Sequence, residues 1–170
     1  MGRQMGSDDS RIKAREQAFF LCFSTEFSQT ELEEAIEAYS EQEQPSAFAL
    51  ELARGCNSSI EQCDRIIEKY LNKWKLSRVP RASRTLLRLS VYQLVISPDN
   101  TAAENPAGVI INDAVRLAKK YATDEDAAFI NGVLGSVAKA VQSGRLSAET
   151  TEKQETAEQT ERTQGADSDE

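Results

Sequence analysis

The feature that most constrains the fold is the segment 109–141, which has the pattern of two apolar-faced helices joined by a short acidic turn. In each half, apolar side chains recur at steps of three and four residues, so they line one face of a helix. Thr123–Asp126 supplies capping oxygens and negative charge where the second helix begins. Such a pair forms half of a small helical core, which the rest of the chain must complete. The two faces consist of Ile111, Val115 and Ala118, with Ala114 and Leu117 beside them, and of Ile130, Val133, Leu134, Val137 and Val141.

Helical spacing also runs through most of the preceding chain. The capping-box pattern Thr30–Glu33 opens one predicted helix, and Pro45 suits the first position of the next. Gly55, Asn57 and Ser58 are weak helix formers, but the apolar stripe around them is unbroken and predicts one long helix. No segment has the alternating pattern of a strand, so we predict an all-α fold of about six or seven helices. The helices before the C-terminal pair are predicted at about 10–25, 28–40, 45–71 and 81–96, and 97–106 is predicted to be a polar loop.

Charge divides the chain into a body and a tail. The net charge is -8. Residues 143–170 contain eight acidic and three basic residues, a net -5, which leaves about -3 for the rest. The tail is also poor in apolar residues, so it cannot form a core. We therefore predict a flexible N-terminus over 1–9, a helical domain over 10–142 and a disordered acidic tail over 143–170.

Several classes of protein are disfavoured by composition. No apolar run approaches the roughly 18 residues of a membrane span, and no signal peptide is recognisable, so we expect a cytoplasmic protein. The chain has no histidine and three cysteines, which leaves too few ligands for a zinc site and no disulfide framework. Without histidine the usual nucleophile–base pairs are missing. We expect no catalytic residue, no metal and no cofactor; Cys56 and Cys63 fit a helix's apolar stripe as small core residues.

Four segments, in one order and register from about residue 10 to 141, resemble the NusB family of transcription antitermination factors. Residues 11–16, RIKARE, are similar to the family's basic R-x-x-A-R-E opening, and 87–94, LRLSVYQL, to its L-R-x-x-x-Y-E-L helix. Residues 106–119, PAGVIINDAVRLAK, are similar to P-x-x-V-x-I-N-E-A-x-E-L-A-K. The most specific match is 129–134, FINGVL, which resembles F-V-N-G-V-L.

This resemblance implies a fold of two packed helical subdomains, which we place at about 10–76 and 80–142. It implies binding of boxA-type RNA together with NusE, a ribosomal small-subunit protein, in an RNA polymerase antitermination complex that acts chiefly on ribosomal RNA operons. It implies no enzymatic activity. The chain departs from the family pattern at Gln93, where relatives carry glutamate, and around Ser83, where many carry an acid. The acidic tail has no family counterpart.

The candidate RNA-binding residues are Arg11, Lys13, Arg15 and Phe129. Cations at the start of a helix oppose its dipole, a small cost that favours a phosphate-binding role over an ordinary solvated turn. Phe129 lies about 100 degrees from the centre of its helix's apolar stripe, by the 100-degree rotation per residue. It is either a platform on which a base stacks or a residue packed on a neighbouring helix.

The candidate partner-binding residues are Phe23 and Arg84. Phe19, Phe20 and Phe23 cannot all face one core, so one or more contacts NusE, a second copy of the chain, or a second subdomain. Arg84 and Arg88 share a helix face and meet either RNA or carboxylates. For Asn131 and Gly132, opposite the main stripe, we predict close helix packing. Asn112–Asp113 fits a helix cap.

Two alternatives accompany the antitermination hypothesis. A NusB-like domain also precedes some ribosomal RNA cytosine methyltransferases, but here only 28 residues follow the predicted domain, which argues against that reading. The other alternative is a protein–protein scaffold of the same fold with weak or no RNA binding. The choice between monomer and homodimer is open at this stage.

Overall fold

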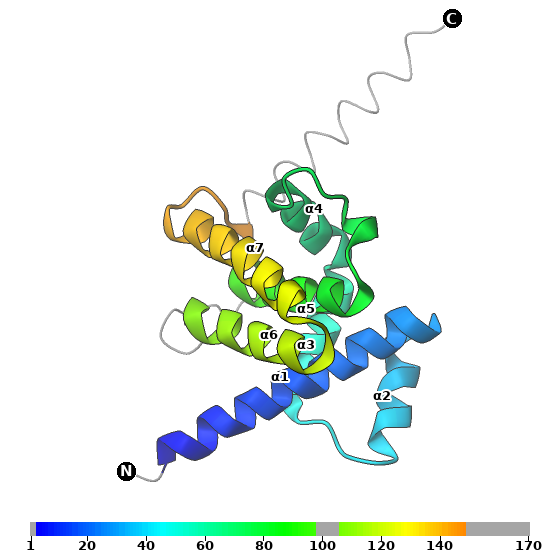
Figure 1. The fold of residues 1–170 in the computed structure, drawn as a ribbon. Coiled ribbons are helices and arrows are strands. Elements are labelled where there is room, and N and C mark those ends of the chain that lie inside the picture. The colour runs from blue at the N-terminus through cyan, green and yellow to red at the C-terminus, as the bar shows by residue number, and fades with distance from the viewer. Residues whose placement is uncertain (1–2, 98–105, 149–170) are drawn as a thin grey trace, which may run out of the picture.

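The computed structural model describes residues 3–97 and 106–148, which form seven α-helices and contain no strand (Figure 1). The predicted all-α fold is confirmed. Most of the predicted loop 97–106 and the tail from 149 onward lie outside the described residues. The helices are α1 (Arg3–Ser28), α2 (Leu32–Ser40), α3 (Ala47–Ser58), α4 (Ile60–Tyr70), α5 (Arg81–Val91), α6 (Ala107–Tyr121) and α7 (Asp124–Gln142), with a 3-10 turn η1 (Leu76–Arg78) and a π-helical turn η2 (Tyr92–Ile96).

Helix α1 crosses the molecule and packs against α2, α3, α5 and α6 (Figure 1). It begins at Arg3, seven residues before the predicted start at Ser10, and ends at Ser28. Its buried face contains Ala14, Ala18, Phe19 and Leu21. One helix therefore carries both the predicted RNA-binding cations and, near its end, the predicted partner-binding phenylalanine. The cations lie within the first half of α1 rather than at its start, where the sequence had predicted them.

The single long helix predicted for 45–71 is wrong, because the chain breaks at Ser59 into α3 and α4. Ser59 has φ -117° and ψ 19°, and its N–H bonds back to the Cys56 carbonyl at 3.0 Å. The weak helix formers Asn57 and Ser58 permit this turn. The apolar stripe continues across the break because both helices bury their cysteine, Cys56 and Cys63, in the same core.

Two of the predicted caps also differ. Pro45 precedes the third helix rather than opening it, and the Ser46 hydroxyl caps α3 by accepting from the Ala49 N–H at 3.1 Å. The Thr30–Glu33 box is not formed, since Glu31 is the cap residue of α2 and makes no side-chain cap bond. At α7 the prediction is confirmed: Thr123 accepts from the Asp126 N–H at 3.1 Å and Asp126 bonds the Thr123 N–H at 3.2 Å.

Helix α5 lies at the centre and contacts α1, α3, α4, α6 and α7 (Figure 1). Its buried side chains include Leu86, Leu87, Leu89 and Val91. The chain continues as the π-helical turn η2, in which the Ser97 N–H donates to the Tyr92 carbonyl at 2.8 Å. The core is one continuous cluster that extends through both halves of the chain.

Helices α6 and α7 form the antiparallel pair predicted from the sequence. Ile130, Val133, Leu134 and Val137 are buried as predicted, whereas the buried face of α6 is rotated towards Ile110 and Asp113. The predicted close packing at Asn131 and Gly132 is wrong: both are exposed, and a Cβ on Gly132 would meet nothing within 4 Å.

Helix α7 ends at Gln142, and Gly144, two residues further on, has a φ of +73°, which suits glycine. The N–H groups of Arg145 and Leu146 both bond the Ala140 carbonyl, at 3.0 and 3.2 Å. Leu146 is buried, so the first residues of the predicted tail pack on the domain.

Candidate functional site

Arg15 has two buried partners that come from the second half of the chain. Its Nη1 donates to Asp113 Oδ2 on α6 at 2.8 Å, and its Nε donates to Gln93 Oε1 in η2 at 2.8 Å. Gln93 in turn donates to the Leu89 carbonyl at 3.0 Å. The Arg15 and Asp113 side chains are only 5% and 8% exposed. We call Arg15, Gln93 and Asp113 the Arg15 cluster; it links α1, η2 and α6.

This geometry corrects two predictions. Arg15 is not at the surface where it would contact phosphate directly, and Asp113 lies in the interior of α6 rather than at a cap. Burial lowers the pKa of Arg15 and the adjacent Asp113 carboxylate opposes this shift. An arginine nevertheless stays protonated at neutral pH, so the cluster holds a buried ion pair. Gln93 fits here because its amide oxygen accepts from Arg15 without adding a second buried negative charge.

Arg11 and Lys13 remain near the surface on the first half of α1. The Arg11 guanidinium lies 5.3 Å from the centre of the Phe48 ring, and its side chain is partly exposed. The Lys13 side chain is 65% exposed and forms an ion pair with Glu43. An exposed ion pair of this kind contributes little to stability, so an anionic ligand can replace Glu43 at low cost.

Glu16 binds α1 to the end of α6 and was not singled out by the sequence. Its carboxylate accepts from Lys120 at 2.8 Å and from the Tyr121 hydroxyl at 2.5 Å, and Arg116 lies 3.7 Å away. Burial raises the pKa of Glu16, but the hydrogen bonds from Lys120 and Tyr121 outweigh it and lower the pKa below its ordinary value. The carboxylate is therefore held in its charged form.

Phe129 is half-buried on α7 and packs against the core cluster. The sequence allowed either an exposed ring on which a base stacks or a ring packed on a neighbouring helix. The observed position lies between these two alternatives. Its neighbour Ala128 is exposed, whereas Ala127 is buried. One side of the Phe129 ring is therefore supported by the protein.

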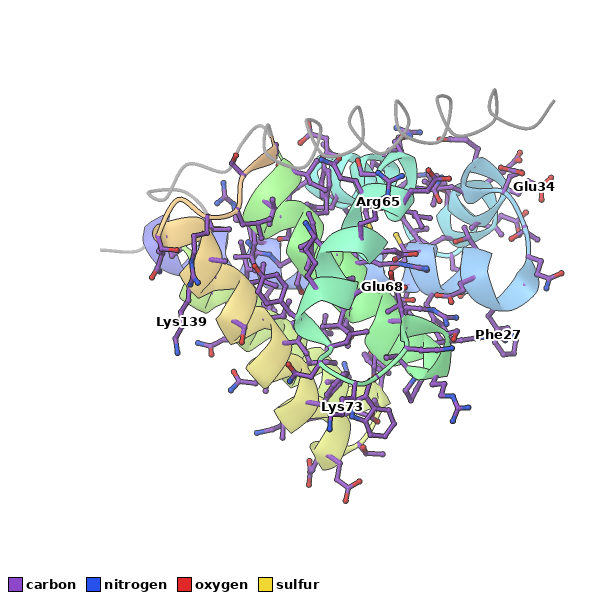
Figure 2. The ribbon with its side chains drawn as sticks, turned by 90° about the horizontal axis from the view of Figure 1, so that it is seen from above. Phe27, Glu34, Arg65, Glu68, Lys73 and Lys139 are labelled. Atoms are coloured by element: carbon purple, nitrogen blue, oxygen red, sulfur yellow. The ribbon has the colours of Figure 1, made fainter. Side chains whose placement is uncertain are left out.

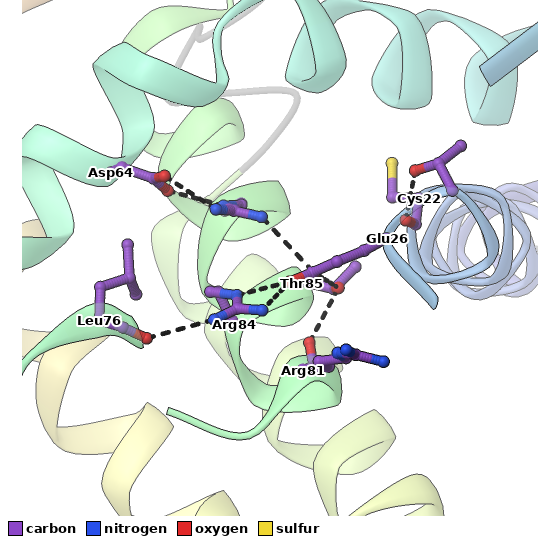
Figure 3. Close-up of polar contacts among 9 residues, drawn as sticks. Cys22, Glu26, Asp64, Leu76, Arg81, Arg84 and Thr85 are labelled. Carbon is purple, nitrogen blue, oxygen red and sulfur yellow. Dashed lines mark hydrogen bonds and ion pairs between the residues drawn. The ribbon is translucent and has the colours of Figure 1, made fainter. Parts of the chain in front are cut away.

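The end of α1 carries a second cluster, centred on Glu26. Figure 3 shows Glu26 extending from α1 towards Arg84 and Thr85 of α5. Its carboxylate pairs with Arg84, whose Nε donates to it at 2.6 Å, and it accepts from the Thr85 hydroxyl at 3.1 Å. Arg88 lies 3.5 Å from the same carboxylate and donates to both Asp64 oxygens, at 2.6 and 2.8 Å. We call Glu26, Arg84, Arg88 and Asp64 the Glu26 cluster.

The Glu26 cluster decides between the alternatives for Arg84 and Arg88, since both meet carboxylates within the chain. The side chains of Glu26, Arg84 and Arg88 are 17–18% exposed. A cavity of 240 Å³ borders the cluster. Its lining includes Glu26, Thr85, Arg88, Cys22 and Cys56.

Next to this cluster, aromatic rings line the side of α1. Phe23 stacks on Phe19 with ring centres 5.6 Å apart and on Phe27 with ring centres 6.0 Å apart. Phe19 is buried, Phe23 is half-buried and Phe27 is 64% exposed. The Arg81 guanidinium lies 5.8 Å from the centre of the Phe27 ring. The three stacked phenylalanine rings therefore extend from the core to the surface. The exposed ring, Phe27, was not among the residues predicted from the sequence.

The described residues offer no group of three histidine, cysteine, aspartate or glutamate side chains placed to hold a metal ion. Cys56 and Cys63 are buried, as predicted, and Cys22 lies half-buried beside them. Contact with the Cys22 and Cys63 thiols, together with burial, raises the pKa of Cys56. Among the described helices, none has the length and apolar composition of a membrane span.

Comparison with known proteins decides the family. A family model described as the NusB family matches residues 12–139. The chain belongs to the NusB family. The transcription antitermination protein NusB of Lysinibacillus sphaericus is 34% identical over 124 residues, which cover 73% of this chain and 93% of that protein. The NusB family is one of transcription antitermination factors rather than of enzymes.

Solved NusB structures have the same fold. The structure of Thermotoga maritima NusB superposes with a TM-score of 0.67 at 31% identity, covering 76% of this chain and 90% of that one. A crystal structure of the antitermination factors NusB and NusE in complex with double-stranded RNA superposes with a TM-score of 0.64 at 28% identity. It covers 78% of this chain and 98% of that one. The resemblance read from the four sequence segments is thereby confirmed.

Proposed function

We propose that this NusB-family chain is a transcription antitermination factor that binds boxA-like RNA together with NusE. The observation that carries the proposal is the family match over residues 12–139, which includes most of α1, all of α5 and α6, and most of α7. The likeness to a NusB bound to NusE and RNA supports the choice of ligands. In this proposal the chain catalyses no reaction and works in the cytoplasm as part of an RNA polymerase complex on ribosomal RNA operons.

For the RNA surface we propose Arg11 and Lys13 as direct phosphate contacts and Phe129 as a stacking contact. Lys13 is well exposed and is held only by a surface ion pair. Half-burial of Phe129 supports one side of the ring and suits stacking of a base on the other. Arg15 acts as a positioning residue, because its ion pair with Asp113 fixes α1 against α6.

For NusE we propose the end of α1, where Phe23 supports the exposed Phe27 ring and Arg81 lies over that ring. Exposed aromatic side chains next to arginine are typical of the residues that dominate protein interfaces. Arg84 contributes by holding Glu26, so its role is to fix the end of α1 against α5.

The test compares a labelled boxA-like RNA with a scrambled RNA, each with and without NusE, at two salt concentrations. We expect the chain alone to bind both RNAs weakly, and selectivity for the boxA-like RNA to require NusE. The double variant Arg11→Ala/Lys13→Ala should bind about tenfold more weakly and reduce the slope of log affinity against log salt by about 1.4, since each contact with a single strand contributes about 0.7. Arg54→Ala, which removes an exposed arginine paired with Glu33, is the matched control and should bind as the wild type does.

One observation favours the scaffold alternative, namely that two of the three predicted RNA-binding cations already have carboxylate partners within the chain. If the scaffold hypothesis holds, both RNAs bind weakly and equally with NusE present, and the double variant changes nothing. That result would overturn the antitermination proposal while leaving the NusE contact intact.

A further inference from the structure

A short surface loop between α4 and α5 is anchored by buried side chains and backbone hydrogen bonds. Leu71 and Leu76 are buried and anchor it, while residues 72–75 between them are all exposed. Asn72 adopts a left-handed φ of 57°, and the Trp74 N–H bonds the Leu71 carbonyl at 3.1 Å. The 3-10 turn that follows adds a 3.0 Å bond from the Arg78 N–H to the Lys75 carbonyl. We call residues 72–78 the cationic loop.

This loop lies in the most basic stretch of the chain. Residues 69–81 contain five lysines and arginines and no aspartate or glutamate, although the whole chain has a net charge of -8. Lys73, Lys75 and Arg78 are exposed, and none of them has an ion-pair partner among residues 3–97 and 106–148. By contrast, Lys13 and Lys120 each pair with a carboxylate. Within the part of the chain that the structure describes, no carboxylate therefore forms an ion pair with Lys73, Lys75 or Arg78.

The centre of the loop is the chain's single tryptophan. Trp74 is 65% exposed, and it is one of three large apolar side chains that are exposed among the described residues. Trp74 belongs neither to the buried core nor to the partly buried side chains packed against it, so most of its ring faces solvent between two lysines. Indole rings flanked by cations are the arrangement on which bases of single-stranded nucleic acid stack while their phosphates meet the cations.

We propose that the cationic loop is a second RNA-binding surface, which takes single-stranded RNA without base-sequence preference. A base stacks on Trp74, and the flanking phosphates contact Lys73, Lys75 and Arg78. Figure 2 shows Lys73 well separated from Lys139, an exposed lysine of α7, so the two can be altered independently. The inference rests on the proposed function, in which the chain binds RNA. It adds an RNA contact outside the surface formed by Arg11 and Lys13, which we call the α1 surface.

Because Trp74 is the only tryptophan, its fluorescence reports directly on this loop. The experiment titrates the full chain, without NusE, with a scrambled single-stranded RNA of about 12 nucleotides, a length within the range of single-strand sites. Inorganic polyphosphate serves as a polyanion without bases. We expect saturable quenching by the RNA and little by polyphosphate, since only a base stacks on the ring.

Variants then separate stacking from charge, with labelled RNA as the readout. Trp74→Ala should weaken binding about tenfold, as removal of a stacking ring does. Lys73→Ala/Lys75→Ala/Arg78→Ala should lower the salt slope by about 2, because three single-strand phosphate contacts are lost. Lys139→Ala is the matched control and should leave affinity and slope unchanged. All these residues are exposed, so the variants are expected to fold, which circular dichroism checks.

The proposal is overturned if RNA does not quench Trp74, if polyphosphate quenches equally, or if the loop variants bind as the wild type does. It is also overturned if an acidic peptide of residues 149–170 quenches Trp74 where RNA does not, since the loop would then bind acidic protein segments. Failure here is distinguishable from failure of the proposed function. NusE-dependent preference for boxA-like over scrambled RNA should persist in the triple loop variant, because the α1 surface is intact in it.

Discussion

Two arginine–carboxylate clusters hold α1 in place, and they differ in burial and in surroundings. The Arg15 cluster is almost completely buried, with side chains 5% and 8% exposed at Arg15 and Asp113. The side chains of the Glu26 cluster are 17–26% exposed, and the cluster borders both a cavity and the exposed Phe27. Eleven residues separate Arg15 from Glu26, or about 16 Å of helix. The buried cluster fixes the part of α1 that carries the proposed RNA-binding side chains, and the less buried one lies beside the surface proposed for NusE.

The largest expected effect comes from breaking the buried cluster. Asp113→Ala leaves the Arg15 guanidinium buried without its carboxylate, which should lower the free energy of unfolding by about 3–5 kcal/mol. Urea denaturation measures the change. The double variant Arg15→Met/Asp113→Leu removes both charges and should recover most of the loss. If Asp113→Ala is as stable as the wild type, the cluster does not hold α1 in the way described.

Near the Arg15 cluster, Gly55 of α3 lies close against η2, the turn that carries Gln93. A Cβ added at Gly55 would overlap the ring and hydroxyl of Tyr92, the residue before Gln93. Gly55→Ala should therefore destabilise the protein by about 1–3 kcal/mol, as overpacking does. Gly132→Ala is the control: its Cβ meets nothing, so the better helix former should stabilise by about 0.5–1 kcal/mol. Thermal denaturation should shift in opposite directions for the two variants, and a shift in the same direction would contradict the packing at Gly55.

A smaller effect is expected at the Glu26 cluster, which is less deeply buried. Glu26→Gln keeps the shape of the side chain and removes its charge, while Arg88 retains Asp64 as a partner. The loss should be about 1–2 kcal/mol, because the groups keep part of their solvation. A loss of stability as large as that of Asp113→Ala would show that the two clusters do not differ in their contribution to stability.

The smallest effect concerns pH. Because the pKa of Glu16 is lowered in the folded protein, its ionised carboxylate stabilises the fold above the unfolded pKa of about 4.3, and this stabilisation is lost as pH falls through the folded value. Glu16→Gln should be less stable than the wild type at pH 6 by less than about 1 kcal/mol. The difference should shrink towards zero near pH 3. A difference that grows in acid would show that the pKa is raised instead.

The sequence predicts local features well and distant partners poorly. The helical spacing of apolar residues and the capping residues predicted the α6–α7 pair, because both depend only on residues close together in the sequence. The burial of Arg15 was not predictable in this way, since Gln93 and Asp113 lie 78 and 98 positions further along the chain. The space around each glycine could not be predicted from the sequence either. Gly55 and Gly132 both sit inside helical patterns, and only the fold reveals that the first has a tyrosine ring against it and the second has open space.

The central claim is that two parts of α1 have separate roles, RNA contact near Lys13 in its first half and NusE contact near Phe27 at its end. The most direct measurement is the affinity of boxA-like RNA, with and without NusE, for Lys13→Glu and Phe27→Ala. We predict that Lys13→Glu weakens RNA binding under both conditions, whereas Phe27→Ala weakens it only when NusE is present. Equal losses for both variants under both conditions would contradict the division of roles along α1.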